Sequence, residues 1–234
     1  MDYYQQIQTA ESLDRLFEIW KNKKPNAEIN HSANYFIVDG IVNSDVWNQK
    51  DKKRILYVLK EAYGTDWNEN TLATWLANDH PKARIWKRVA KWTYGIQNTD
   101  SNALKAYKAE LSEAEHNSSL DQIAVINLKK SSGNSSSNYD EIDRYAEYDR
   151  EEIKKEFELI DADIIICGST FKTLNHIVFG REEVVPNENW FYYLKVCGRE
   201  RLFIDYYHPA NHWSDLINYY GLTGIYQQAL KAKE

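Results

Sequence analysis

The chain has 234 residues, 43% of them hydrophobic and 27% charged, which is enough for one well-buried domain. Its formal net charge of −6 gives no general attraction to nucleic acid, and two cysteines are too few for a four-cysteine zinc or iron–sulfur site. No apolar stretch approaches 18 residues and no export signal is visible. We therefore expect a single domain over 1–234, a cytoplasmic location and no membrane partner.

Residues 1–50 predict a helix and a hairpin that extend the domain at its N-terminal side. Apolar residues recur at helical spacing from Thr9 to Lys21, with Thr9 as the N-cap. The stretch Tyr35 to Val42 reads YFIVDGIV and predicts a hairpin that turns at Asp39-Gly40, a common turn pair.

The sequence RILYVLKEAYG, from Arg54 to Gly64, predicts the central strand. Five apolar residues in a row between charges and a glycine are typical of a parallel strand that is buried on both faces. Glu61 lies two residues after the last of them, so it is expected at the carboxyl edge of the sheet, where open α/β sheets bind ligands.

Two helices are predicted next, a short one from Leu72 to Ala77 and a longer one from Pro81 to about Tyr94. The longer helix contains no acidic residue and carries a basic stripe: Arg84, Lys87, Arg88 and Lys91. Such a stripe is either a solvated face or a face that contacts phosphate. The second interpretation makes Arg84, Arg88 and Lys91 candidate DNA-binding residues.

Strands and helices alternate through the rest of the chain. A long helix is predicted from Asp140 to Ile160, another opens after Gly168, and a loop near an active site is predicted over Ser131 to Asn138. The predicted strands are Ile123–Leu128, Asp163–Cys167, Trp190–Val196 and Leu202–Tyr206. Long crossovers between strands predict the α/β class, as a three-layer α/β/α sandwich with a central, mainly parallel four-stranded sheet.

Three strand ends carry polar residues that a core does not need: Glu61, Asn127 and His208. A carboxylate, an amide and an imidazole in one cleft can orient water, read a donor–acceptor edge and stabilise a developing anion. The HPANH segment has the histidine spacing of a zinc helix, but Pro209 follows the first histidine and no glutamate follows it. We therefore expect no metal and no cofactor.

The order and strand context of four motifs resemble the uracil-DNA glycosylase superfamily, and most closely its iron–sulfur branch, over about residues 53 to 215. Lys60-Glu61-Ala62-Tyr63-Gly64 is similar to the GEAPG motif, and Asn127-Leu-Lys-Lys130 to a strand-end N-x-x-K. Asp163 to Thr170 is similar to the third strand and its helix start. Tyr207 to Ala210 is similar to the His-Pro-Ser loop, although the cluster cysteines are absent.

The resemblance implies a DNA repair enzyme that flips a damaged base out of single- or double-stranded DNA and cuts its bond to deoxyribose. His208 would stabilise the departing base anion, and Glu61 would shape the pocket mouth or position water. The substrate-binding residues would be Asn127, which reads the N3/O4 edge, together with Ala62, Tyr63 and Lys130. The segment that enters the minor groove would be Pro209 to Trp213, with Pro209, Ala210 and Asn211 as DNA contacts. The candidate platforms for the flipped base are Tyr63, Trp67 and Trp75.

Three functions remain open at this point. The trio of Glu61, Asn127 and His208 favours a glycosylase for uracil or another deaminated base. The acidic charge, Tyr63 in place of the motif proline and Ala210 in place of the motif serine favour a module on the same fold that binds a base or nucleotide without cleaving it. A hydrolase of free nucleosides would also explain the lack of positive charge.

Overall fold

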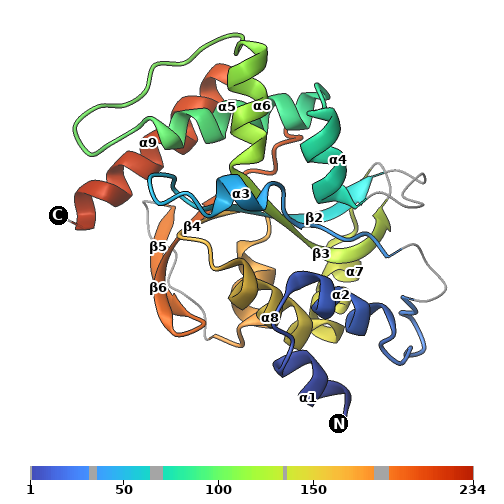
Figure 1. Ribbon diagram of the computed structural model, residues 1–234. Coiled ribbons are helices and arrows are strands. Elements are labelled where there is room, and N and C mark those ends of the chain that lie inside the picture. The colour runs from blue at the N-terminus through green and yellow to red at the C-terminus, as the bar shows by residue number, and fades with distance from the viewer. Residues whose placement is uncertain (1, 32–35, 64–70, 134–135, 182–189, 234) are drawn as a thin grey trace.

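A six-stranded sheet forms the centre of the computed structural model, which describes residues 2–31, 36–63, 71–133, 136–181 and 190–233 (Figure 1). The strand order is β1-β3-β2-β4-β6-β5. The strands are β1 (Gly40–Ile41), β2 (Ile55–Tyr63), β3 (Ile123–Gly133), β4 (Ile164–Gly168), β5 (Phe191–Val196) and β6 (Arg199–Tyr206). None of the helices in the described ranges is long and apolar enough to cross a membrane.

The sheet is mixed, so the α/β class is confirmed and the prediction of a four-stranded sheet is wrong. The inner strands β3, β2, β4 and β6 pair in parallel, whereas β1 and β5 pair antiparallel at the two edges. Only Cys197 and Gly198 connect β5 to β6, both with positive φ, and so short a turn can join antiparallel strands only. At the other edge, β1 is too short to show a sequence period.

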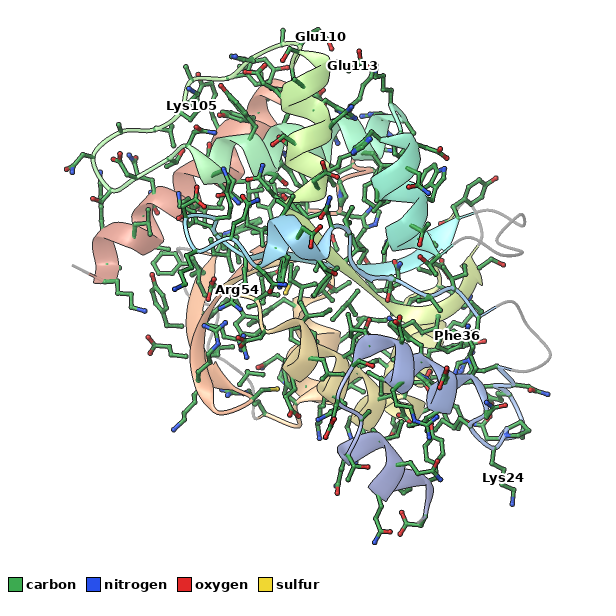
Figure 2. All side chains as sticks on the ribbon, viewed as in Figure 1. Lys24, Phe36, Arg54, Lys105, Glu110 and Glu113 are labelled. Atoms are coloured by element: carbon green, nitrogen blue, oxygen red, sulfur yellow. The ribbon has the colours of Figure 1, made fainter. Side chains whose placement is uncertain are left out.

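The central strand is buried on both faces, as its apolar run predicts. Leu56 and Val58 belong to the core on one face, and Ile55 and Tyr57 to the core on the other. All four are fully buried, because successive side chains of a strand alternate between faces and helices cover both. Side chains accordingly fill the space on both sides of the sheet (Figure 2).

The helices divide between the two faces. One core includes residues of α1 (Tyr3–Gln8), α2 (Leu13–Lys21), α3 (Ser44–Trp47), α7 (Tyr139–Tyr148), α8 (Arg150–Ile160) and the π-helical turn η1 (Thr173–Val178). The other includes residues of α4 (Leu72–Asp79), α5 (Arg84–Gln97), α6 (Glu113–Asp121) and α9 (Asp215–Lys233). Figure 1 shows α1, α2, α7 and α8 on one side of the sheet and α4, α5, α6 and α9 on the other.

Several predicted boundaries in the N-terminal part are corrected. Thr9 is the C-cap of α1, and Ser12 caps α2 by accepting a hydrogen bond from the Arg15 backbone N–H. The predicted hairpin does not form, because Gly40–Ile41 pairs with β3; Tyr35 lies outside the described residues. In α5 the first helical residue is Arg84 rather than Pro81.

Two further corrections concern the segments around the long predicted helix. Ser131 to Gly133 continue β3 rather than beginning a loop. The helix predicted from Asp140 to Ile160 is divided at Asp149, which ends α7 and begins α8. Asp149 is fully buried and binds Lys23 and His31 of the N-terminal extension. The break between α7 and α8 thus lies at the residue that makes these contacts.

Candidate functional site

A cavity of about 690 Å³ opens at the carboxyl ends of β2 and β3, beside the loop that follows β6. Glu61, Asn127 and His208 all line it, so the three predicted strand ends meet in one place. Its remaining wall is largely apolar and includes Leu59, Leu72, Trp75, Ile85 and Trp86. An apolar cavity with a few convergent polar groups is typical of a site for a small organic group.

The backbone around His208 fixes both the place and the tautomer of its imidazole. The His208 N–H donates to Ser169 Oγ at 3.0 Å, and the Ala210 N–H donates to His208 Nδ1 at 3.2 Å. Because Nδ1 accepts, the proton of the neutral ring lies on Nε2. His208 therefore has one remaining donor, Nε2–H.

The imidazole of His208 is neutral at pH 7. Burial and, to a smaller extent, the positive charge of Lys60 together lower its pKa from 6.5 to about 4. Lys60 also lines the cavity, with its Nζ 4.9 Å from the centre of the Tyr139 ring. A neutral donor is thus held beside a cation in a cavity with little polar surface.

This lowered pKa predicts a pH dependence of stability. Between pH 6.5 and about 4 the unfolded chain binds a proton at His208 that the folded chain does not, so the free energy of unfolding falls as the pH falls. We expect wild type to lose about 2 kcal/mol more than His208→Gln between pH 7 and pH 4.5, measured by urea unfolding. Burial raises the pKa of Asp205 to about 6, which has the opposite sign but is common to both proteins. Equal losses would show that His208 titrates normally.

The turn after β4 brings His208 close to the sheet. A Cβ on Gly168 would lie 3.5 Å from His208 Cα, an ordinary contact, but 2.9 Å from Leu59 Cδ2, so the glycine leaves room for the Leu59 side chain in the cavity wall. Ser169, whose hydroxyl holds the His208 backbone, has a φ of 58° in the left-handed region. Strained backbone of this kind is concentrated at functional sites.

Asn127 is almost fully buried and is held by Asp39. Its backbone N–H and its side-chain Nδ2 donate to Asp39 Oδ2, at 2.6 and 3.2 Å. Sequence reasoning assigned Asp39 to a turn and missed this role, because the contact joins residues 88 positions apart.

Lys130, predicted to bind substrate, lies outside the cavity. It is fully buried, its Nζ binds Asp39 and Glu156, and it lies 5.0 Å from the ring centre of Trp20. Asn127 and Lys130 are three positions apart in one strand, and an odd spacing places two side chains on opposite faces. The alternation of strand side chains could have revealed this from the sequence.

Glu61 lines the cavity as an ion-paired carboxylate. Lys129 Nζ lies 2.9 Å from Glu61 Oε2 and 2.9 Å from Glu141 Oε1, and the side chains of Lys129 and Glu61 are both 5% exposed. Glu61 and Lys129 are register partners in β2 and β3. The carboxylate is therefore held in place by a lysine of the next strand.

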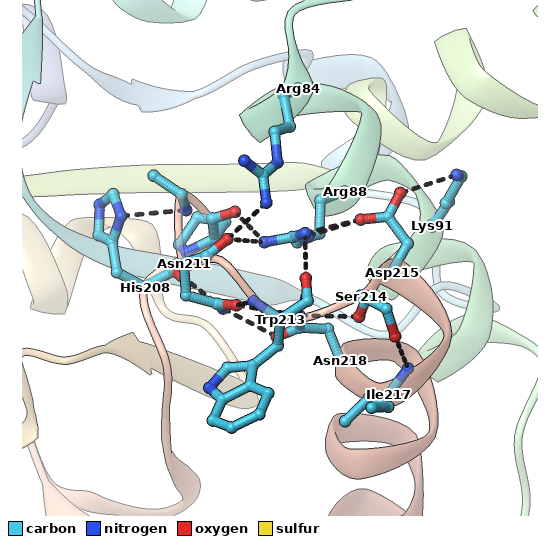
Figure 3. Close-up of polar contacts among 12 residues, drawn as sticks. Arg84, Arg88, Lys91, His208, Asn211, Trp213, Ser214, Asp215, Ile217 and Asn218 are labelled. Atoms are coloured by element: carbon cyan, nitrogen blue, oxygen red, sulfur yellow. Dashed lines mark hydrogen bonds and ion pairs between the residues drawn. The ribbon is translucent and has the colours of Figure 1, made fainter.

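Arg88 and Lys91 do not face solvent, so the prediction that they contact phosphate is wrong. Arg88 is 1% exposed and donates to the carbonyls of Pro209, Asn211 and Trp213 and to the carboxylate of Asp215, at 2.7 to 2.9 Å (Figure 3). Lys91 is also buried, and its Nζ lies 3.1 Å from Asp215 Oδ2. These two cations anchor the loop that carries His208.

The predicted DNA contacts in this loop differ in accessibility. Pro209 is buried, and the Asn211 side chain is bound within the loop, to the His208 carbonyl and to Asn218. Ala210 and Trp213 are exposed, Trp213 to 57%. Arg84 is exposed as well and donates to the Asn211 carbonyl at 2.8 Å.

The aromatic residues predicted to stack on the flipped base differ in where they lie and in how exposed they are. Trp67 lies outside the described residues, and Tyr63 lines the cavity mouth at 73% exposure. Trp75 lies in the cavity wall and makes an edge contact with Trp86, with ring centres 6.3 Å apart. Trp75 and Trp86 thus provide a more enclosed aromatic surface than Tyr63 does. Trp86 was not among the residues predicted from the sequence.

No family model, curated protein or solved structure matches this chain. Among the residues that the structure describes, no group of three or more His, Cys, Asp or Glu side chains is placed to hold a metal ion.

Proposed function

We propose that this protein is a DNA glycosylase that hydrolyses the N-glycosidic bond of uracil or another deaminated base. The observation that carries the proposal is the pairing of a neutral His208 Nε2–H donor with the buried Asn127 amide in one largely apolar cavity. The resemblance of the four motifs to the uracil-DNA glycosylase superfamily supports the same activity.

Cleavage of the glycosidic bond leaves a negative charge on the departing base. A donor that is already oriented in a site with little water stabilises such a charge strongly. His208 provides that donor, and the Asn127 amide provides a donor and an acceptor for the edge of the base. The backbone amides near Ala62 and Tyr63 are a further source of donors at the cavity wall.

Lys60 adds a positive charge to the same cavity. Among the described residues no carboxylate lies within ion-pair distance of Lys60 Nζ, which lies over the Tyr139 ring. A cation near the leaving base favours its anionic form, and together with burial it keeps the His208 imidazole neutral. Lys60 belongs to the motif Lys60 to Gly64, but the sequence alone predicted no role for its side chain.

A second candidate, a module that binds a base without cleaving it, is favoured by the ion pair at Glu61. A carboxylate that is bound to Lys129 at 2.9 Å is less free to orient water. Ala62, which follows it, has no side chain that could replace it. In this alternative the cavity binds the base and the bond stays intact.

Incubation with uracil-containing single- and double-stranded DNA, followed by alkali, tests the proposal. A glycosylase leaves abasic sites, which alkali converts to strand breaks at the uracil position. Binding of the same DNA without breaks would overturn the glycosylase and support the binding module.

The exposed tryptophan of the loop predicts the DNA contact. We expect Trp213→Ala to weaken binding of uracil-containing DNA by roughly 1–3 kcal/mol, the contribution of one aromatic that stacks on a base. The matched control is Tyr4→Ala, which removes an exposed aromatic from α1 on the other face of the sheet. Fluorescence anisotropy measures both, and equal affinities for the two variants would assign DNA contact elsewhere.

A further inference from the structure

Asp39 joins two residues of β3 through a single carboxylate. Its Oδ2 accepts from the backbone N–H and the Nδ2 of Asn127, while its Oδ1 accepts from Lys130 Nζ. Asp39 is 3% exposed and belongs to the N-terminal extension, outside the region that resembles the glycosylases. From this different part of the chain it contacts Asn127, which lines the cavity.

The segment that carries Asp39 is fixed on both sides. The Ile37 N–H donates to the Lys130 carbonyl at 2.6 Å, and the Leu72 N–H donates to the Val38 carbonyl at 2.7 Å. Gly40, with a φ of 113°, turns the chain so that β1 can pair with β3. The carboxylate of Asp39 is therefore held at a fixed place relative to Asn127.

Both oxygens of this carboxylate act as acceptors. Lys130 Nζ can only donate, and it binds Asp39 Oδ1 as well as Glu156. The backbone N–H of Asn127 donates to the other oxygen, Asp39 Oδ2. Asp39 therefore accepts three hydrogen bonds in all.

With donors on both of its oxygens, Asp39 is an acceptor toward Asn127, so the Nδ2 of Asn127, and not its Oδ1, faces Asp39. The second Nδ2 hydrogen and Oδ1 then form the donor–acceptor pair with which Asn127 contributes to the cavity. Bases with a ring N–H beside a carbonyl complement this pair. Deamination creates that edge in uracil and hypoxanthine, whereas cytosine and adenine present the reverse pattern.

We propose that Asp39 determines which bases the cavity accepts, by locking the Asn127 amide in the orientation that fits the N–H/C=O edge of deaminated bases. Asp39 acts as a positioning residue, because Asn127 is the residue that would contact the base. The inference rests on the proposed function only in requiring that the cavity bind a base, and it holds for the glycosylase and for the binding module.

Asp39→Asn tests this lock by calorimetric titration with free bases. The variant side chain cannot accept from both Lys130 and Asn127, so the Asn127 amide becomes free to turn over. We expect wild type to prefer uracil over cytosine, and hypoxanthine over adenine, by roughly tenfold or more, and Asp39→Asn to lose most of that preference. In an Asn127→Ala background, Asp39→Asn should cause no further loss, because the effect passes through Asn127.

The matched control is Glu152→Gln, which disturbs another buried lysine–carboxylate group, around Lys23, away from the cavity. It should keep the base preference. Asn127→Ala, which leaves the Asp39–Lys130 pair intact, should lose the preference even where Asp39→Asn does not fold. A retained preference in either folded variant, or no binding of any base by wild type, would overturn the inference. A wild type that binds uracil selectively without excising it would overturn the glycosylase alone.

Discussion

His208→Ala is expected to lower the rate of base release by roughly 10²–10³-fold while leaving the affinity for uracil-containing DNA nearly unchanged. One oriented donor to a developing anion typically contributes this much to a rate. The contribution is made in the transition state, because the base carries no negative charge before the bond breaks, so binding of the substrate loses little.

Single-turnover kinetics on uracil-containing single-stranded DNA, with affinity measured in parallel, separates these two effects. His176→Ala is the matched control. His176 lies on η1, its ring is hydrogen-bonded to the Arg181 carbonyl, and it does not line the cavity. We expect this variant to release base at the wild-type rate. A His208→Ala protein that is as fast as wild type would remove His208 from the mechanism.

The sequence predicted those features of the fold that depend on local patterns. The five apolar residues Ile55 to Leu59 predict a strand that is buried on both faces. In agreement with this, β2 lies inside the sheet between β3 and β4. Parallel strands expose their carboxyl ends at one edge, which explains why the ends at Glu61, Asn127 and His208 meet at one cavity. The antiparallel pairing of β1 was missed because two residues show no alternation, whereas the two-residue turn between β5 and β6 could have predicted their antiparallel pairing.

Features that depend on distant partners could not be predicted. Arg88 and Lys91 look like members of a solvated stripe, and their partner Asp215 lies more than 120 residues further along the chain. Asp39 next to Gly40 has the composition of a turn, and only the pairing of β1 with β3 places it against Asn127. In both cases the local sequence is compatible with two environments, and the tertiary contact selects one.

Arg88→Met is expected to destabilise the protein by roughly 3 kcal/mol and to lower base release further than this loss of folded protein explains. Removing one partner of a buried ion pair typically costs about 3–5 kcal/mol, and the 32% exposure of the Asp215 side chain places Arg88 at the lower end. The guanidinium also holds three carbonyls of the loop, at Pro209, Asn211 and Trp213. Without it the loop loses the contacts that place His208 in the cavity wall.

Arg201→Met provides the matched control for this variant. Arg201 is also buried and also donates to backbone carbonyls and to an aspartate, but it lies near the start of β6, at the end of that strand opposite His208. Urea unfolding should show a comparable loss of stability for both variants, whereas base release per folded molecule should fall in Arg88→Met alone. Equal activities of the two folded variants would show that Arg88 contributes to stability and not to the site. The salt dependence of DNA binding should be the same in Arg88→Met and in wild type, because a buried guanidinium releases no counterions from DNA.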